Sequence, residues 1–257
     1  MTNSQLYETM FKRKSIRKYD MTPLDDAAIT KIKNYASGIK PLDERIPYEF
    51  TYLSSDDVKN LFPIKAPHYI CLYSGKKDGH FMNAGFLLQQ MDLYFSANNI
   101  GSCWLGMAKP SKELPERKDG MEFIMMIAFG KTAEPLHRSR VSEFKRKGLG
   151  EITNIAGMED VLEPVRLAPS ASNSQPWFIS GSGDELIVSR KSLNVITSPI
   201  FGKFNQIDTG IALFHLWLSL DHQGKIAAFE FKKTEVPKGY DYMATVRIRS
   251  NNEDKSK

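Results

Sequence analysis

Two strongly apolar segments, residues 81–97 and 209–220, place the tightest limits on how this chain can fold. In the first segment, apolar residues recur at spacings of three or four: Phe81, Ala84, Leu88, Met91 and Phe95. This periodicity predicts a helix, and further apolar residues around it indicate that the helix is buried on most sides. At 257 residues the chain can form one large domain or two small halves with separate cores.

Shorter patterns predict the surrounding elements. Runs rich in aromatic and β-branched residues predict strands at 48–54, 67–74, 121–130, 177–179, 185–190, 229–233 and 242–250. Helices are expected at 5–13, after Pro23, and at 158–167. Residues 131–157 are polar and basic, and we expect them to connect two halves, 1–150 and 151–257.

The second half repeats the order of elements in the first. Aligning the two apolar segments pairs Leu88 with Leu213 and Leu93 with Leu218, 125 residues apart. Strands 49–51 and 177–179 pair at an offset of 128, and the strands around Met126 and Thr245 pair at a similar separation. These offsets favour an internal duplication, although element order alone is equally compatible with an unduplicated α+β protein.

Composition narrows the class of protein. A content of 41% hydrophobic and 25% charged residues is typical of a globular chain. The net charge of +5 suits an anionic small molecule and falls short of a nucleic-acid footprint. Cys71 and Cys103 lie in apolar contexts, so we expect both to be reduced and buried, with no metal site. Without a signal-like or membrane-spanning apolar run, we expect a cytoplasmic protein that contacts no membrane.

Two motifs carry the chemistry. The first, Arg13-Lys14-Ser15-Ile16-Arg17, places cations beside a hydroxyl, and such groups donate hydrogen bonds to phosphate oxygens. The second, residues 168–177 (APSASNSQPW), combines two prolines with uncharged polar side chains and predicts a rigid turn suited to a heterocycle or polyol. Taken alone, the first is more often a solvated basic face and the second an ordinary serine-rich loop.

Together the two motifs resemble the pair that marks the FMN-dependent nitroreductase family. Residues 97–106 (ANNIGSCWLG) resemble the family's segment after its central helix, where a backbone N–H meets the flavin's reactive edge. Residues 129–131 and 145–152 resemble its strand end and basic phosphate-binding segment. The resemblance implies an α+β fold, a nitroreductase-like α-β-α sandwich.

One departure from the family pattern bears on the architecture. The place where ordinary members carry the Pro-Ser-Asn motif holds residues 36–41 (ASGIKP), and the second half has no Arg-x-Ser-x-Arg. The chain thus resembles a fused branch of the family, in which two related halves form an intramolecular pseudo-dimer. This implies one composite flavin site, a non-functional mirror site, and a monomer with an internal pseudo-two-fold axis.

The resemblance also implies cofactors and their ligands. NADH or NADPH would donate a hydride to N5 of FMN, and a small-molecule acceptor such as a nitroaromatic or a quinone would then take the electrons. The implied phosphate grip is Arg13, Lys14, Ser15 and Arg17 with Lys145 and Arg146; the implied ring and ribityl contacts are Pro169, Ser170, Ala171 and Asn173; and the implied N5 donors are the backbone N–H groups of Leu105 and Gly106. The choice among residues 145–147 stays open.

Three alternatives remain at this stage. A relative within the superfamily could perform quinone, enone or dehalogenation chemistry. A flavin-binding or flavin-storage protein could have little turnover. A ligand-binding α+β domain could carry both motifs by coincidence. No histidine lies in a HExxH or triad-like arrangement, and no side chain stands out as a general acid or base.

Overall fold

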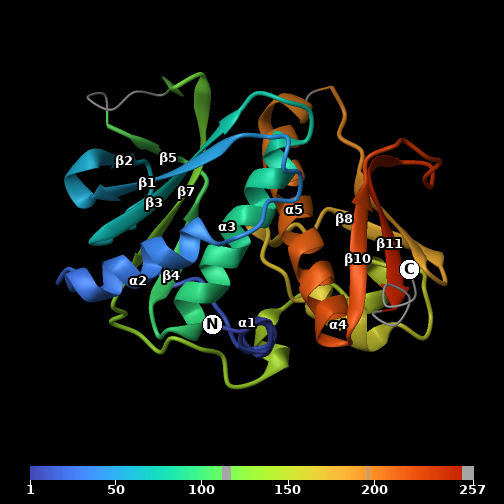
Figure 1. Cartoon of the computed structure of the whole chain (residues 1–257), viewed down its shortest axis with the longest axis horizontal. Helices are drawn as coiled ribbons and strands as arrows, with labels where there is room; N and C mark the ends of the chain where they lie inside the picture. The colour runs from blue at the N-terminus through green and yellow to red at the C-terminus, as the bar shows by residue number, and fades with distance from the viewer. Residues whose placement is uncertain (112–116, 196, 251–257) are drawn as a thin grey trace, which may run out of the picture. The chain divides into compact units, whose positions relative to one another are not determined.

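A computed structural model describes residues 1–111, 117–195 and 197–250 of the chain (Figure 1). It divides into two compact units. The central unit comprises Lys12–Val141, and the terminal unit comprises Met1–Phe11 together with Ser142–Lys257. These bounds differ from the expected halves, 1–150 and 151–257, because the N-terminal helix packs on the long helix of the terminal unit and residues 146–147 hydrogen-bond to residues 167–175.

The central unit is a sheet with helices. Its main elements are α2 (Asp26–Ser37), β1 (Tyr48–Ser54), β3 (His68–Gly75), α3 (His80–Ala97), β4 (Gly101–Leu105) and β7 (Met121–Gly130). The strands are antiparallel in the order β1-β3-β7-β4, and β6 (Arg117–Lys118) also pairs with β7. A short separate ladder joins β2 (Val58–Asn60) to β5 (Ala108–Pro110), and η1 (Ser55–Asp57) precedes it.

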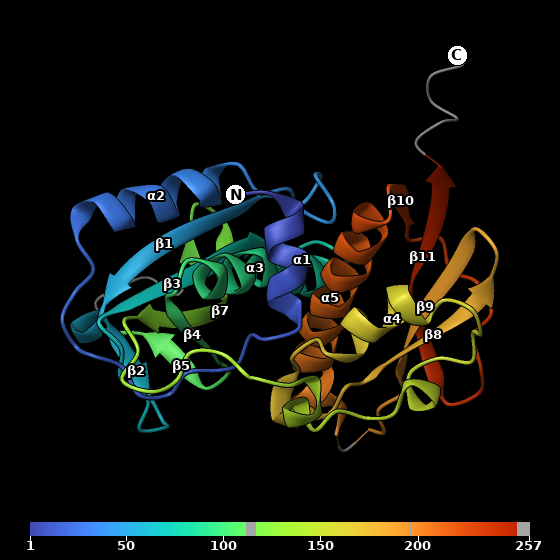
Figure 2. The same ribbon diagram turned by 90° about the horizontal axis from the view of Figure 1, so that it is seen from below.

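Helix α3 supplies much of the core of the central unit. It packs against β3, β4 and β7 (Figure 2). Its residues Leu87, Leu88, Met91 and Phe95 have no exposed surface. The helix is therefore buried on most sides, as its apolar periodicity predicts.

The terminal unit has its own sheet. Its main elements are α1 (Asn3–Met10), α4 (Glu159–Arg166), β8 (Trp177–Ser182), β9 (Glu185–Lys191), α5 (Ser198–His222), β10 (Lys225–Glu230) and β11 (Tyr240–Ser250), with short 3-10 helices η2 (Val141–Phe144), η3 (Leu149–Glu151) and η4 (Ala171–Asn173). Helix α1 packs on α5: the Tyr7 and His222 rings stack with centroids 3.7 Å apart. Asn3 Nδ2 donates to Asp221 Oδ2 at 2.9 Å.

The two units share one topology. Each runs helix, strand, strand, long buried helix, strand, strand, and the sheet order β8-β9-β11-β10 of the terminal unit repeats the order β1-β3-β7-β4. The last strand of each unit also carries a bulge at the same place, with Ile124 left unpaired between Phe123 and Met125, and Met243 between Tyr242 and Ala244. Because bulges are position-specific features of related sheets, this match is independent of element order.

Three sequence-based bounds are corrected. The strand expected at 229–233 lies at Lys225–Glu230, and α5 begins at Ser198 rather than near Thr209. The helix expected at 5–13 lies at Asn3–Met10. Cys71 and Cys103 are free and buried, as expected. In the described part of the chain, no helix combines the length and apolarity needed to cross a membrane.

Candidate functional site

The Arg-x-Ser-Ile-Arg motif lies in an extended segment that follows α1. Its backbone is fixed to β4, because the Ile16 N–H donates to the Ser102 carbonyl at 2.8 Å. Ile16 is fully buried, and a Cβ atom at Gly101 would lie 2.9 Å from its Cγ2. Only glycine therefore allows the motif to approach β4 this closely.

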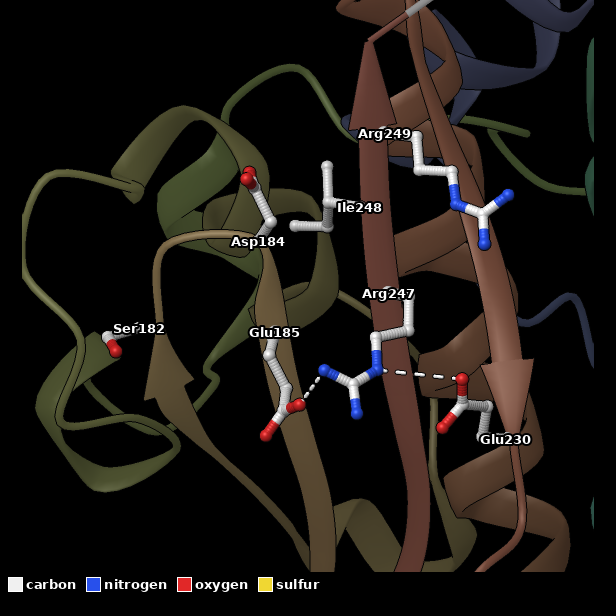
Figure 3. A pocket seen from close by; sticks show the side chains of 7 residues that line it. All are labelled: Ser182, Asp184, Glu185, Glu230, Arg247, Ile248 and Arg249. Carbon is white, nitrogen blue, oxygen red and sulfur yellow. Dashed lines mark ion pairs between the residues drawn. The ribbon is translucent and has the colours of Figure 1, made fainter. Parts of the chain in front are cut away.

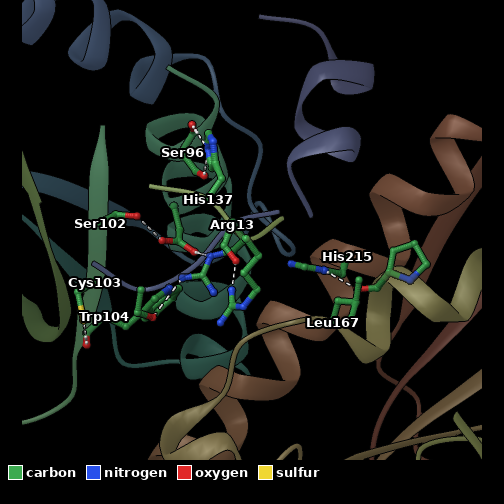
Figure 4. Close-up of polar contacts among 12 residues, drawn as sticks. Arg13, Ser96, Ser102, Cys103, Trp104, His137, Leu167 and His215 are labelled. Carbon is green, nitrogen blue, oxygen red and sulfur yellow. Dashed lines mark hydrogen bonds and ion pairs between the residues drawn. The ribbon is translucent and has the colours of Figure 1, made fainter. Parts of the chain in front are cut away.

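Arg13 is buried within a chain of polar contacts (Figure 4). Its Nε lies 2.9 Å from Asp92 Oδ2 on α3, and its Nη2 donates to Ser15 Oγ at 3.2 Å. The Ser102 hydroxyl donates to Asp92 Oδ1 at 2.6 Å. Arg138 adds a hydrogen bond to the Arg13 carbonyl. The guanidinium is thus paired with a buried carboxylate instead of lying on a solvated basic face.

The rest of the motif is more accessible. Lys14 and Ser15 are half-buried, and Arg17 is exposed while its N–H donates to Glu134 Oε1 at 3.2 Å. Because Asp92 compensates the charge of Arg13, Lys14 and Arg17 carry the more accessible positive charges of this motif.

The predicted N5 donors lie where β4 ends. Leu105 is buried and pairs with Met126, whereas Gly106 is exposed in the turn that follows. The neighbouring Cys103 is buried, and burial raises the pKa of its thiol above the ordinary value. This thiol is therefore protonated at neutral pH and is no candidate nucleophile.

The Pro-Ser-Asn loop is a rigid, strained segment of the terminal unit. Ser172, Asn173 and Gln175 all have positive φ, between 44° and 56°. Such left-handed backbone is costly for residues other than glycine and persists only where neighbours hold it. The loop is therefore preorganised by contacts on more than one side.

One of these contacts comes from α5. Both carboxyl oxygens of Asp208 lie within reach of the Ala171 N–H, at 3.0 and 3.1 Å. Asp208 is almost fully buried, and this burial raises its pKa to about 8 although the Ala171 hydrogen bond opposes the shift. The carboxyl group ties the apex of the loop to the core helix.

A second set of contacts comes from Gln175, which points inward. Gln175 is 1% exposed; its Nε2 donates to the Arg166 carbonyl at 2.8 Å, and its Oε1 accepts the Lys147 N–H at 2.8 Å. The Lys147 Nζ donates to the Gln175 carbonyl at 2.9 Å, and burial lowers the pKa of this lysine. Gln175 is one of the uncharged polar side chains of the motif, but its amide binds Lys147 of the basic segment and the Arg166 carbonyl instead of facing a ligand.

The basic segment and the loop lie side by side. Asn173 accepts a hydrogen bond from Arg146 and donates to the Lys145 carbonyl at 3.0 Å, while Arg146 Nε donates to the Leu167 carbonyl at 3.3 Å. Lys145 has a φ of 50° and an exposed side chain. Among the three basic residues, Arg146 and Lys147 hold the loop, and Lys145 extends outward.

The predicted ligands thus fall into two groups. The central unit carries Arg13, Lys14, Ser15, Arg17, Leu105 and Gly106, and the terminal unit carries Lys145, Arg146, Pro169, Ser170, Ala171 and Asn173. Sequence reasoning missed Asp92, Ser102 and Asp208. A signal was available for Asp92, which is the one carboxylate in the apolar run 81–97.

Two other polar groups are structural. His215 is buried, and its Nδ1 lies 2.7 Å from the Pro164 carbonyl, so this histidine links α5 to α4 (Figure 4). On the sheet of the terminal unit, Arg247 lies between Glu185 and Glu230 in a shallow hollow (Figure 3). The residues that line this hollow include none from the two motifs.

Comparison with known proteins identifies the family and the fold. A family model described as "Putative TM nitroreductase" matches residues 5–220. The crystal structure of a "putative nitroreductase" from Thermotoga maritima has a TM-score of 0.64 at 20% identity and covers 96% of this chain and 94% of that chain. A nitroreductase family protein from Clostridium difficile 630 gives a TM-score of 0.45 at 18% identity, covering 57% of this chain and 94% of that chain.

A further solved structure is an FMN-dependent nitroreductase from Clostridium difficile R20291, with a TM-score of 0.40 at 19% identity, covering 52% of this chain and 89% of that chain. No curated protein matches the chain. The family model spans most of the sequence, including both motifs. The chain therefore has a nitroreductase-like fold and belongs to this nitroreductase family.

Proposed function

We propose that this chain is an FMN-dependent NAD(P)H oxidoreductase of nitroreductase type, which works by a ping-pong reaction on a nitroaromatic, quinone or similar acceptor. The observation that carries the proposal is the group of possible hydrogen-bond donors to a phosphate at residues 13–17. This segment is held against β4 and α3, in a chain that belongs to this family. The proposed cofactor is FMN, and the proposed electron donor is NADH or NADPH.

The donors fit a phosphate group. Lys14, Ser15 and Arg17 provide two cations and a hydroxyl, and the guanidinium of Arg13 keeps donors beyond those used by Asp92 and Ser15. Lys145 is the exposed cation of the basic segment. The segment stays next to the loop because Asn173 accepts a hydrogen bond from Arg146 and donates one to the Lys145 carbonyl. We assign these residues to the phosphate.

The loop fits a contact with an uncharged heterocycle or a polyol. We assign Pro169, Ser170, Ala171 and Asn173 to the ring and the ribityl chain. Asn173 has a second amide hydrogen besides the one it donates to the Lys145 carbonyl, while the Ala171 N–H is already used by Asp208. Ala171 would therefore contact the cofactor through its methyl group or carbonyl.

The protein's part in the reaction is to bind and orient. When bound, FMN supplies the redox chemistry, taking a hydride from NADH or NADPH and passing electrons to the acceptor. The backbone N–H groups of Leu105 and Gly106 are the proposed hydrogen-bond donors to N5. Burial raises the pKa of Cys103 and lowers that of His137, which keeps both groups neutral near pH 7.

We further propose that the two units arose by duplication and replace the two subunits of ordinary members as an intramolecular pseudo-dimer. Their common strand order and the bulges at Ile124 and Met243 support this origin. So does a matching contact on the two long helices. Asn83 Oδ1 accepts the Leu42 N–H at 2.8 Å, and Asp208, 125 residues after Asn83, accepts the Ala171 N–H, 129 residues after Leu42.

The first experiment is the visible spectrum of the purified chain, with the released flavin identified and counted. We expect about one FMN per chain, which NADH or NADPH bleaches rapidly without oxygen and an added quinone or nitroaromatic restores. A chain that binds FMN but is not bleached would be a flavin-binding or storage protein. A chain that binds no FMN after reconstitution would contradict the proposed function.

A further inference from the structure

The polar contacts around Arg13 form a continuous chain inside the central unit (Figure 4). The Ser102 hydroxyl donates to Asp92 at 2.6 Å, and Asp92 lies 2.9 Å from Arg13 Nε. Arg13 in turn donates to Ser15 at 3.2 Å. Arg13, Asp92 and Ser102 are each no more than 1% exposed.

This arrangement is not explained by fold stability. A buried ion pair loses the hydration of both charges, and apolar side chains of similar volume usually give an equally stable core. Asp92 lies on a helix whose neighbouring core positions, such as Met91 and Leu93, are apolar and fully buried. What the contacts do restrict is how the Arg13 guanidinium can turn, because Asp92 forms an ion pair with it and Ser15 accepts a hydrogen bond from its Nη2.

The duplication offers an internal comparison. At the offset of 125 residues that pairs Leu88 with Leu213, Asp92 corresponds to Trp217 and Ser102 to Ala227. The strand pairing agrees with this match. Ser102 pairs with Phe129 on β7, five residues after the bulge residue Ile124, and Ala227 pairs with Ile248 on β11, five residues after the bulge residue Met243.

The second half also has no Arg-x-Ser-x-Arg motif. The second half therefore lacks the counterparts of Arg13, Asp92 and Ser102 all together. Core leucines remain in both halves.

We propose that Asp92 and Ser102 are positioning residues for Arg13: Ser102 orients the Asp92 carboxylate, and Asp92 aims the guanidinium at the phosphate of FMN. This inference rests on the proposed function. It assigns to α3 and β4 two residues that touch no cofactor but determine how tightly its phosphate is bound.

The test uses Ser102→Ala, because this change leaves the local charge unaltered. Replacing Asp92 would alter the electrostatic repulsion of the phosphate together with the orientation of Arg13. The matched control is Ser74→Ala, another fully buried strand hydroxyl of the central unit, which donates to the Pro47 and Gly75 carbonyls. The full-length apoprotein is titrated with FMN and with riboflavin, which lacks the phosphate.

We expect Ser102→Ala to raise the Kd for FMN about five-fold and to change the Kd for riboflavin less than about two-fold. Ser74→Ala should change neither Kd by more than about two-fold. In an Arg13→Lys background, which keeps the charge but lacks the planar fork, adding Ser102→Ala should have no further effect. Ser102→Thr, which restores a hydroxyl, should restore FMN affinity.

Equal weakening of FMN and riboflavin by Ser102→Ala would show a general structural role and overturn the inference, as would an unchanged Kd for FMN. Persistence of the Ser102→Ala effect in the Arg13→Lys background would overturn it too, since the effect would not pass through the guanidinium. If the wild-type chain bound neither flavin, the proposed function itself would fail, and this inference with it.

Discussion

Asp208 is a buried carboxyl group whose protonation is coupled to folding. Burial raises its pKa from 3.8 to about 8, so the folded chain holds this proton more tightly than the unfolded chain. The preference of the folded chain for the protonated carboxyl therefore stabilises the fold fully below about pH 4. This stabilisation falls as the pH rises and is gone above about pH 8. Each pKa unit corresponds to about 1.4 kcal/mol, which makes the total loss several kcal/mol.

We expect Asp208→Asn to remove this pH dependence. An asparagine stays neutral and can still accept the Ala171 N–H through its Oδ1. Urea unfolding at a series of pH values should show the variant close to wild type near pH 4 and increasingly more stable than wild type as the pH rises to 8.5. Parallel pH profiles for the two proteins would mean that Asp208 is ionised in the folded chain throughout this range.

Lys145 and Lys147 should separate binding from stability. Lys145 is exposed, whereas Lys147 donates through Nζ to the Gln175 carbonyl. We expect Lys145→Ala to weaken FMN binding about three- to ten-fold, less so at high salt, with unchanged unfolding. Lys147→Ala should lower the free energy of unfolding by about 1 kcal/mol. The reverse assignment of the two effects, in flavin titrations and urea unfolding, would contradict this reading of the basic segment.

At the scale of elements, the contact between the motif and β4 depends on Gly101. A methyl group there would lie 2.9 Å from Ile16 Cγ2, so Gly101→Ala must displace the motif or the strand. Overpacking of this kind lowers the free energy of unfolding by about 1–3 kcal/mol. Because the phosphate-binding side chains of the motif would be displaced, we also expect weaker FMN binding.

The control for that change is Gly150→Ala, because a Cβ at Gly150 would meet nothing within 4 Å. We expect this variant to keep the FMN affinity and the stability of the wild type. Thermal unfolding and FMN titration of both variants measure the difference. A Gly101→Ala protein that matched the control would show that Ile16 can shift without cost.

Local patterns predicted elements well where side-chain periodicity decides them. The apolar spacing of 81–97 gave α3 almost to the residue, and the aromatic run at 48–54 gave β1. Strand β10 was placed too late, because residues 225–228 (KIAA) become strand through pairing with β11 rather than through their own preference. That α1 packs on α5 depends on contacts such as Tyr7 with His222, which lie far apart in the sequence.

The candidate site shows the same division. Residue types and spacing identified residues 13–17 as a candidate phosphate-binding segment, because cations and a hydroxyl can donate hydrogen bonds to a phosphate. They also identified the loop by its prolines and uncharged polar side chains. They did not show that Arg13 would be buried against Asp92, or that Gln175 would turn inward to the basic segment. Both outcomes depend on which neighbours the fold brings within hydrogen-bond distance.

For the whole molecule, the proposed duplication makes a quantitative prediction about cofactor and mass. Only one copy of each motif is present: residues 36–41 lack the asparagine and glutamine of the loop, and Trp217 and Ala227 stand where the Arg13 network would need Asp and Ser. If the proposal is right, the chain should bind one FMN without a second subunit.

We therefore expect light scattering coupled to gel filtration to give the mass of a single chain, with one FMN per chain by absorbance. In a mixing experiment, a variant lacking the grip (Arg13→Gln, Arg17→Gln) and a variant lacking the loop side chains (Ser170→Ala, Asn173→Ala) should not restore each other's FMN binding. A site that took its ligands from two chains would complement in this way. Complementation, a two-chain mass or two FMN per chain would each contradict the view that one chain carries one complete site.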